Sequence, residues 1–350
     1  MKRYLFFVNA EYCYAILRPL QTVIRQRGDE AAWFVMGCSA QPLNADERLM
    51  NSVQEVMDFA PDAVFSPGDW VPYFFPGKKV QVFHGIARNK RGAATEAESD
   101  HYRIRGWFDL YCTHAVSDTE RFKGLADRLQ TFHVVHTGWP KLDPFFQARD
   151  QYCHAQANAV PTVFFASTFS PSITAAPALA DTIERLSASG QWRFIVTLHP
   201  KMETSVVARY QSIKNPNFEF VPAGQDFLPA MARADVMVCD TSSIMYEFMF
   251  LNKPLVTFKT RNPGPFLIDI DSPNALVGAL QQAIERPAAQ LSAAQGLCQE
   301  LHSLNDGRSS ERVLQAVEQL CAGTLGPRKA KPGNWWRKLK VRSRMGHWDW

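Results

Sequence analysis

Two histidines in the sequence come at the end of hydrophobic runs that predict buried strands. His84 ends the run VQVFH (80–84), and His199 lies in WRFIVTLHP (192–200). A histidine with an ordinary pKa of about 6.5 can take a proton from an attacking hydroxyl near neutral pH, which is general-base chemistry. On residue types alone, a capping histidine is an equally good interpretation of His84, and a structural role is the more common one for an isolated His-Pro pair such as His199-Pro200.

Glycine and basic residues follow both histidines. Gly85 allows a tight turn after the first run, and Arg88 and Lys90 come next along the chain. Lys201 follows the second run. Cationic side chains of this kind form charge-assisted hydrogen bonds with phosphate oxygens. Both strand ends are therefore candidate sites for an anionic ligand, although a solvated basic loop explains the first of them equally well.

A hydroxyl-rich segment follows a third hydrophobic run. In MVCDTSSIMYEF (237–248) the run ends at Asp240, and Thr241, Ser242 and Ser243 open a predicted helix that contains Glu247. The first turn of a helix has unpaired N–H groups and a partial positive charge, so it can hold a phosphate. An ordinary N-cap, with Glu247 facing solvent or a neighbouring group, is the more common explanation of such a segment.

A fourth segment, NDGRSSERV (305–313), combines a turn with the start of a helix. Asp306 and Gly307 favour the turn, and Ser309 or Ser310 is expected to cap the helix. Arg312 then lies in the first turns of this helix, from which its guanidinium could reach a phosphate. Helix capping is the default interpretation of the segment.

These candidate residues need a scaffold, and the hydrophobic pattern predicts one. The predicted strands are 4–10, 31–36, 62–65, 80–84, 110–117, 132–136, 161–168, 192–200, 218–222, 234–240 and 254–259. The predicted helices are 14–27, 45–59, 146–159, 176–189, 203–213, 226–233, one from 242, 273–285 and 309–321. Continuous apolar runs separated by helices are typical of parallel sheets that are covered on both faces.

The order of these elements predicts an α/β protein with two Rossmann-like, doubly wound parallel-sheet domains. We expect the first domain over 1–150, the second over 151–325, and a tail over 326–350. Neither GxGxxG nor GxxxxGK[ST] occurs, so the dinucleotide fingerprint and the P-loop are absent. Ligands of such sheets bind beyond the C-terminal ends of strands. The polar residues at the strand ends are therefore the site candidates.

The tail differs from the rest of the chain in its charge. Residues 326–350 contain eight Lys/Arg and one acid, a net +7, which leaves −3 for residues 1–325 out of the total of +4. Four of the nine tryptophans also lie there. A basic, tryptophan-rich segment is suited to an anionic membrane surface. It could instead be disordered or pack back on the first domain. We expect no nucleic-acid partner, because the body is negatively charged and has no basic, aromatic face.

Composition narrows the class of protein further. The 350 residues are 46% hydrophobic and 21% charged, which is typical of a globular protein. Seven widely spread cysteines without a CxxC pair favour a reducing compartment, so we expect a cytoplasmic protein. The remaining histidines lack the spacing of metal ligands, and we predict no metal site and no cofactor.

Taken together and in this order, the segments resemble one known family. The segments are HGI and Lys at 84–90, GWPKLD at 138–143, LHPK at 198–201, CDTSS and Glu at 239–247, KPLVTF at 253–258 and DGRSSERV at 306–313. They resemble the CDP-glycerol glycerophosphotransferases, which include teichoic acid polymerases and primases and their capsule-polymer relatives. Each segment alone is weakly specific, but six in the correct order are fairly specific.

The resemblance implies a GT-B-like fold with two domains that face a cleft, and no essential metal. It implies that an acceptor hydroxyl attacks the β-phosphorus of CDP-glycerol and releases CMP. The family's two histidines correspond to His84 and His199, and its hydroxyl-rich phosphate loop to 241–243. The further residues that we expect to bind the donor phosphates are Gly85, Arg88, Lys90, Lys201, Asp240, Glu247 and Arg312. Thr241 stands where the family usually has an aromatic residue, and Glu247 where it usually has aspartate. CDP-ribitol or another nucleotide-activated donor therefore remains an alternative.

We therefore expect a transferase that moves glycerol phosphate, or a similar polyol phosphate, to a hydroxyl of a lipid-linked or cell-envelope glycan acceptor. We expect it in the cytoplasm, peripheral at the inner face of the membrane. A nucleotide-sugar glycosyltransferase or an enzyme similar to UDP-N-acetylglucosamine 2-epimerase is the alternative. Few acids lie at the predicted strand ends, which argues against the epimerase. A non-catalytic module that binds a nucleotide or a polymer is the second alternative.

Overall fold

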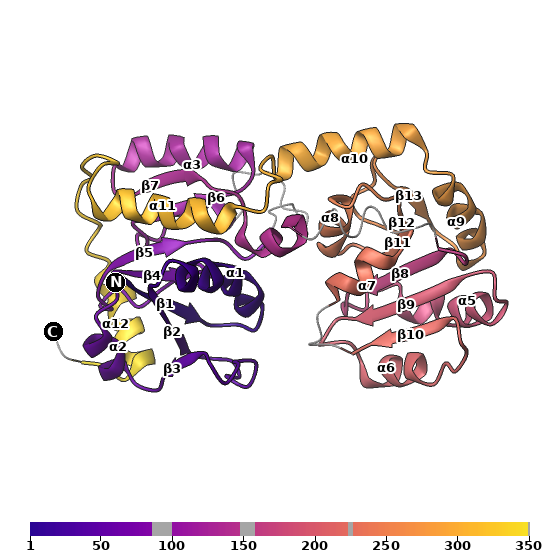
Figure 1. Cartoon of the computed structure of the whole chain (residues 1–350), viewed down its shortest axis with the longest axis horizontal. Coiled ribbons are helices and arrows are strands. Elements are labelled where there is room, and N and C mark those ends of the chain that lie inside the picture. Colours follow the sequence, from indigo (N-terminus) through magenta and orange to yellow (C-terminus); the bar gives the residue numbers. More distant parts are fainter. Residues whose placement is uncertain (86–99, 148–157, 223–226, 349–350) are drawn as a thin grey trace. The chain divides into compact units, whose positions relative to one another are not determined.

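The computed structural model describes residues 1–85, 100–147, 158–222 and 227–348. The described residues form two compact units. The first contains residues 1–85, 100–147 and 300–348, and the second contains 158–222 and 227–299. Each unit is built around one sheet (Figure 1). The described helices include none that is both long and apolar enough to cross a membrane.

The sheet of the first unit has seven parallel strands in the order β3-β2-β1-β4-β5-β6-β7. The strands are β1 (Arg3–Val8), β2 (Glu30–Val35), β3 (Arg48–Met50), β4 (Ala63–Ser66), β5 (Lys78–Gln81), β6 (Leu110–Thr113) and β7 (His133–His136). All residues of β1 after Arg3 are buried, as expected for a strand covered on both faces. The strand order changes direction between β1 and β4.

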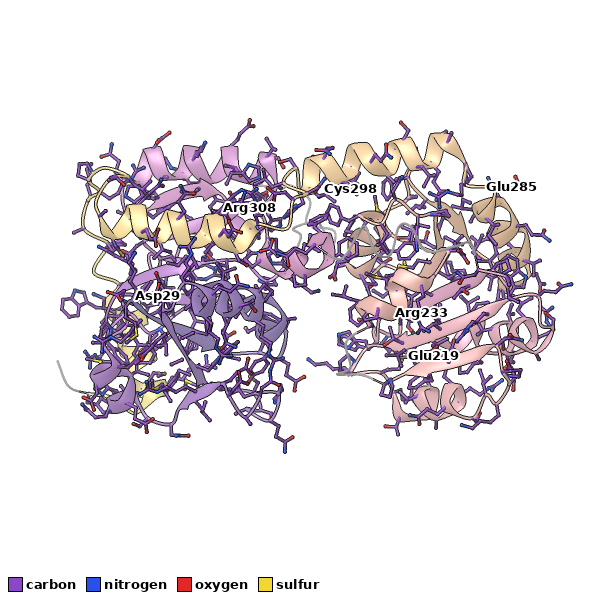
Figure 2. The ribbon with its side chains drawn as sticks, viewed as in Figure 1. Asp29, Glu219, Arg233, Glu285, Cys298 and Arg308 are labelled. Atoms are coloured by element: carbon purple, nitrogen blue, oxygen red, sulfur yellow. The ribbon has the colours of Figure 1, made fainter. Side chains whose placement is uncertain are left out.

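The helices of the first unit are α1 (Tyr12–Gln26), α2 (Val53–Phe59), α3 (Val116–Leu129), α11 (Ser309–Cys321) and α12 (Trp335–Met345), with short 3₁₀ turns η2 (Asp100–Tyr102) and η3 (Pro140–Leu142). Helix α11 begins directly after Arg308, as Figure 2 shows. We expected Ser309 or Ser310 to cap this helix, but no serine side chain accepts a hydrogen bond from its first N–H groups. Instead, the buried Asp143 accepts hydrogen bonds from the backbone N–H of Ser309 at 2.8 Å and of Ser310 at 2.6 Å.

The second unit repeats the same strand order with six parallel strands, β10-β9-β8-β11-β12-β13. The strands are β8 (Thr162–Ser167), β9 (Arg193–Leu198), β10 (Phe218–Val221), β11 (Val236–Cys239), β12 (Leu255–Phe258) and β13 (Ile268–Ile270). The helices are α5 (Ala176–Ala188), α6 (Thr204–Gln211), α7 (Leu228–Arg233), α8 (Ile244–Met249), α9 (Leu276–Ile284) and α10 (Ala288–Leu301), with the 3₁₀ turn η4 (Pro273–Ala275). The prediction of two doubly wound parallel sheets is confirmed.

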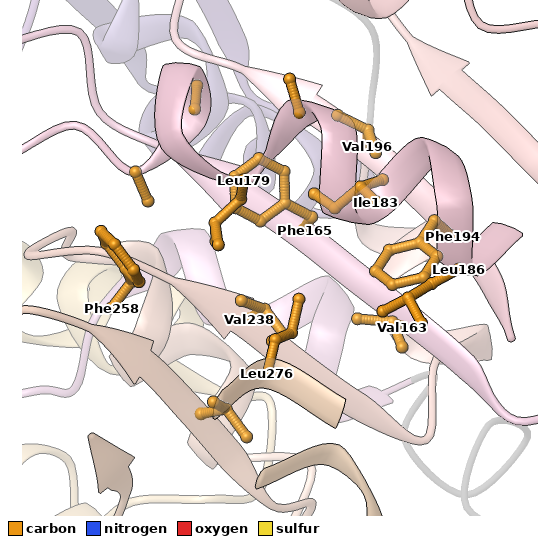
Figure 3. Packing of buried hydrophobic residues seen from close by; sticks show 14 of the residues in the cluster. Val163, Phe165, Leu179, Ile183, Leu186, Phe194, Val196, Val238, Phe258 and Leu276 are labelled. Atoms are coloured by element: carbon orange, nitrogen blue, oxygen red, sulfur yellow. The ribbon is translucent and has the colours of Figure 1, made fainter. Parts of the chain in front are cut away.

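The core of the second unit lies between its sheet and the helices α5 and α9. Figure 3 shows Leu179 and Ile183 of α5 packed over Phe165 of β8 and Val196 of β9. At the edge of the sheet, Glu219 of β10 forms an ion pair with Arg233 of α7 at 2.9 Å (Figure 2). Burial of these apolar side chains is the main stabilising contribution to such a unit.

Several predicted elements differ from the observed ones. The expected helix 45–59 is replaced by the short strand β3 and the helix α2, which begins after Ser52, whose side chain accepts a hydrogen bond from the N–H of Glu55. The strand β13 and the helices α10 and α12 were not predicted. The predicted helix 146–159 lies mostly outside the described residues. Residues 300–325 belong to the compact first unit, because α11 packs against α1 and β5.

The described residues of the tail, 326–348, pack against the rest of the first unit, which is one of the open alternatives. Val341 of α12 is buried in the same hydrophobic cluster as Val56 and Phe59 of α2. The Nε of Arg342 donates to the hydroxyl of Tyr73 at 2.6 Å. Lys331 forms an ion pair with Asp109 at 2.6 Å.

Two histidines lie fully inside the first unit. His114, after β6, is 1% exposed, and neither of its ring nitrogens has a hydrogen-bond partner. His302 is 0% exposed, and its Nε2 accepts from the backbone N–H of Trp139 at 2.8 Å. Burial lowers the pKa of His114 to about 3 and that of His302 to about 4. Both rings are therefore neutral in the folded protein at ordinary pH.

We expect the free energy of unfolding to fall as the pH decreases through 6.5, the pKa of an unshifted histidine. The two histidines then bind protons in the unfolded chain, whereas they stay neutral in the folded protein. This difference lowers the free energy of unfolding by about 2 kcal/mol per group between pH 7.5 and 5. Urea unfolding followed by tryptophan fluorescence measures this. The His114→Phe variant should lose less stability over the same interval. An equal loss in both proteins contradicts the assignment.

Candidate active site

The polar residues of the second unit gather at the C-terminal edge of its sheet. The strands β8 and β11 are neighbours there, and the strand order changes direction between them. Loops that leave such a pair of strands diverge, and doubly wound proteins bind ligands at this point. The residues at this edge are Phe169 and Ser172 after β8, His199 and Lys201 after β9, 240–243 after β11 and Arg261 after β12.

Asp240 connects the two strands at this point. Its carboxylate, 0% exposed, accepts hydrogen bonds from the hydroxyl of Ser167 at 2.5 Å and from the backbone N–H of Thr168 at 2.9 Å and of Ala175 at 3.1 Å. Burial raises its pKa, an effect that these hydrogen bonds oppose. Asp240 thus holds the loop between β8 and α5 against the end of β11.

The hydroxyl-rich segment forms a tight turn before α8. The N–H of Ser242 bonds to the carbonyl of Asp240 at 2.8 Å, and Ser242 and Ser243 are half-buried. The hydroxyl oxygen of Thr241 accepts from the backbone N–H of Arg261 at 2.9 Å. Helix α8 begins only at Ile244, later than predicted, and Glu247 is buried within it.

Arg261 is a basic residue at this edge that the sequence analysis missed. Its backbone N–H donates a hydrogen bond to the hydroxyl of Thr241. Its side chain is exposed, and its Nη2 lies 3.5 Å from the hydroxyl of Ser172. The only signal in the sequence is a basic residue three positions after a strand end. This arrangement adds a cation to the hydroxyls of the 241–243 turn.

His199 is exposed at the end of the neighbouring strand β9. Its Nδ1 accepts a hydrogen bond from the backbone N–H of Lys201 at 3.0 Å, so the proton of the neutral ring is carried by Nε2. The ring lies 4.5 Å from the ring of Phe169, which is 38% exposed, and the Nζ of Lys201 lies 5.8 Å from the same ring. The loop after β8 therefore contacts His199 as well as Asp240.

The first unit carries the other predicted histidine. His84 is exposed two residues after Val82, and its ring lies 5.5 Å from that of Tyr12, the first residue of α1. Gly85 is half-buried. Arg88 and Lys90 lie outside the described residues. The roles that we expect for these side chains stay predictions.

Arg312 lies in the first unit, on α11. It forms an ion pair with Asp306, and its Nη1 lies 3.4 Å from the carbonyl of Thr137. The adjacent Gly138 has φ +82°, and a Cβ there would lie 2.4 Å from the hydroxyl of Ser309. The segments GWPKLD and DGRSSERV are thus packed against each other. The phosphate-binding role predicted for Arg312 stays a prediction.

The structure thus gathers the predicted residues in two sets. His199, Lys201 and the residues 240–243 lie at one edge of the second unit, where Arg261 joins them. His84, Gly85 and Arg312 belong to the first unit. At the edge of the second unit, a histidine N–H, two cationic side chains and several hydroxyls can bind an anion. The exposed histidine of the first unit can accept a proton.

Comparisons of the structure with solved structures show the same fold in enzymes of two kinds. The wall teichoic acid polymerase TagF is 12% identical, with 93% of this chain and 90% of that chain covered, at a TM-score of 0.63. MnaA of S. aureus, in complex with UDP, is 14% identical, with 95% and 100% covered and a TM-score of 0.60. The UDP-GlcNAc 2-epimerase of Neisseria meningitidis is 13% identical, with 91% and 100% covered and a TM-score of 0.58. These likenesses confirm the GT-B type of fold.

The sequence comparisons decide between these kinds of enzyme. No curated protein matches the chain. The model of the CDP-glycerol:poly(glycerophosphate) glycerophosphotransferases matches residues 62–319, which is most of the chain and includes His84, Arg312 and the strand ends of the second unit. The resemblance seen in the ordered motifs is therefore confirmed. The chain belongs to the CDP-glycerol:poly(glycerophosphate) glycerophosphotransferase family and is a transferase of that type.

Proposed function

We propose that this protein transfers glycerol phosphate from CDP-glycerol, or a similar polyol phosphate from a CDP-activated donor, to a hydroxyl of a lipid-linked or glycan acceptor of the cell envelope. The acceptor oxygen forms a bond to the β-phosphorus, the bond from this phosphorus to the bridging oxygen breaks, and CMP leaves. Membership of the glycerophosphotransferase family carries this proposal. A solved structure of the polymerase TagF contains CDPG, which supports the choice of donor.

The edge of the second unit is the proposed donor site. Phosphoryl transfer needs positioning and neutralisation of charge more than covalent help from the protein. The Nε2 proton of His199, the ammonium of Lys201 and the guanidinium of Arg261 would bind the diphosphate oxygens together with the hydroxyls of Ser242 and Ser243. The UDP complex of S. aureus MnaA supports binding of a pyrimidine nucleoside diphosphate by this kind of fold.

His84 is the proposed general base. It would accept the proton of the acceptor hydroxyl as the oxygen attacks phosphorus. Its exposure at the C-terminal edge of the first sheet and its place in the ordered family motifs support this role. The nucleotide donor and the cysteine content favour the cytoplasm, and a lipid-linked acceptor favours its membrane face.

The alternative reactions predict different products. A nucleotide-sugar transferase releases UDP or UMP, an epimerase releases only an altered sugar nucleotide, and a binding module releases nothing. MnaA and the UDP-GlcNAc 2-epimerase of Neisseria meningitidis share the fold alone with this chain, at 14% and 13% identity. Incubation with CDP-glycerol, CDP-ribitol and UDP-sugars, followed by analysis of the nucleotides, separates these reactions. Release of CMP supports the proposal, and release of UDP or UMP without CMP contradicts it.

We expect His84→Ala to lower the rate of CMP release by about 10²–10⁴-fold, the usual contribution of a general base. A short poly(glycerol phosphate) oligomer serves as acceptor, and CDP binding measured by calorimetry should be unchanged. His347→Ala, which replaces a histidine of the tail that packs against Phe74, is the matched control. Retention of most activity by His84→Ala removes the assignment.

We expect Ser242→Ala to weaken the binding of CDP-glycerol by about 1–3 kcal/mol, because a hydrogen bond to a charged phosphate is lost. Thr241→Ala should weaken it comparably, since the Thr241 hydroxyl also holds the backbone of Arg261 at 2.9 Å. Calorimetry measures both. Ser205→Ala is the control, since this hydroxyl lies on α6 and bonds to Glu203. Unchanged affinity in both loop variants counts against the site.

We propose in addition that the exposed face of the tail binds an anionic membrane. Trp335 and Trp336 of α12 are 67% and 81% exposed, and Trp348, which follows this helix, is 53% exposed. Lys340 of α12 is also exposed. Tryptophan favours the membrane–water interface, and each basic residue adds about 1 kcal/mol near an anionic surface. Two cationic residues of the tail, Arg342 and Lys331, instead interact with Tyr73 and Asp109 of the first unit.

We expect the full chain to sediment with anionic phosphatidylglycerol vesicles at low salt and less at high salt, because the attraction is electrostatic. Truncation after Leu325 should abolish this. Because Val341 is part of the core, Trp336→Ala combined with Lys340→Glu tests the same surface with the fold retained. Lys123→Glu, an exposed substitution on α3, is the control. Equal sedimentation of all variants, or binding that ignores salt, contradicts the membrane surface.

A further inference from the structure

The residue directly before His84 has an unusual backbone conformation. Phe83 has φ +55°, in the left-handed region that bulky side chains rarely occupy. Among the described residues, six other non-glycine residues have positive φ: Ala60, Gln130, Asn252, Lys259, Arg286 and Asn334. Four of these follow the C-terminal end of a helix, where a left-handed residue is common, Asn334 precedes α12, and Lys259 follows β12. Phe83 is the one aromatic residue of this set.

The surrounding residues hold Phe83 in this conformation from two sides. Its side chain is 3% exposed, and its ring centroid lies 5.2 Å from that of Phe122 of α3 and 5.1 Å from that of His101 of η2. Its carbonyl lies 3.4 Å from the indole Nε1 of Trp139, which donates a hydrogen bond to it. Both the side chain and the main chain are therefore fixed to elements other than β5.

The left-handed residue changes the course of the chain exactly where the strand pairing stops. The N–H of Val82 still bonds to the carbonyl of Ser66 on β4 at 3.2 Å. Val82 and Phe83 are both buried, as are the residues of the covered parallel strands, whereas His84 is exposed beside Tyr12. An ordinary core phenylalanine does not need a positive φ. The left-handed conformation lies directly before the change from buried residues to the exposed His84.

We propose that Phe83 is a positioning residue, whose left-handed backbone and buried ring fix the place of His84 at the edge of the sheet. This inference rests on the proposed function of His84 as general base. Phe83 is 3% exposed, and we assign it no contact with substrate. The proton of the acceptor hydroxyl passes to His84, and Phe83 limits the positions from which His84 can receive it.

The test compares Phe83→Gly with Phe83→Leu. Glycine accepts the left-handed backbone but removes the buried anchor, whereas leucine keeps an apolar anchor. We expect Phe83→Gly to lower kcat for CMP release from CDP-glycerol, with a poly(glycerol phosphate) oligomer as acceptor, by about 10- to 100-fold, because small displacements of a catalytic group cost this much. The KM for CDP-glycerol should change by less than about threefold, and Phe83→Leu should restore most of kcat.

Two controls separate positioning from a loss of structure. Phe59→Leu removes a buried ring of α2, which is not among the elements that hold Phe83, and should leave kcat nearly unchanged. In the His84→Ala background, Phe83→Gly should change the residual rate by less than about twofold, because residues that act through one group are not additive. Should Phe83→Gly fail to fold, Trp139→Phe removes the N–H that holds the Phe83 carbonyl and keeps an aromatic ring there. It should also lower kcat at constant KM.

An activity-independent measurement distinguishes the failure of this inference from that of the proposed function. In the histidine-labelled protein, the ring protons of His84 should show a nuclear Overhauser effect to Tyr12, and Phe83→Gly should abolish it. If His84→Ala is inactive while Phe83→Gly keeps both full kcat and this effect, positioning by Phe83 is wrong and the base assignment stands. If His84→Ala is active, the base assignment fails. Retention of the effect in Phe83→Gly then also overturns positioning.

Discussion

A buried carboxylate holds together the edge on which the proposed donor site depends. The hydrogen bonds of Asp240 to Ser167, Thr168 and Ala175 join the end of β11 to the loop after β8, at the point where the strand order changes direction. That loop carries Phe169, which contacts His199. Replacement of the carboxylate would leave buried N–H groups unpaired, which costs about 1–3 kcal/mol each. The hydrogen bonds of the buried Asp240 therefore help to fix the position of the exposed His199 without any contact between Asp240 and a ligand.

The first unit uses a second aspartate in a similar way. Asp143 ends the segment GWPKLD and binds the first N–H groups of α11, which belong to DGRSSERV. Two segments separated by more than 160 residues thus share one buried carboxylate, and Gly138 lets them approach closely. Burial raises the pKa of Asp143, while its hydrogen bonds to the two serines oppose that shift. The motifs of the family therefore include residues that stabilise the fold, such as Asp143, besides those expected to bind a ligand.

The sequence predicted the two sheets and the strand ends well, because long apolar runs mark buried parallel strands. His84 and His199 were found because each ends such a run. The strands β3 and β13, of three residues each, are too short to give a periodic signal, so they were missed. Phe169, Arg261 and Phe83 were missed because their importance comes from contacts between distant segments and from a backbone angle. Asp240 was expected to bind the donor, and its inward hydrogen bonds became visible only with the fold.

The inward use of carboxylates also explains how a site for an anion can form on a body with net charge −3. Parallel strands and helices leave unpaired N–H groups at the edge where the strands end. Asp240 and Asp143 satisfy such groups inside the units, so their charges are directed at backbone dipoles and away from solvent. The exposed groups at the edge of the second unit include His199, Lys201 and Arg261, whereas Asp240 is buried. Because a diphosphate senses the local field more than the net charge, the three exposed side chains support the proposed binding of an anionic donor there.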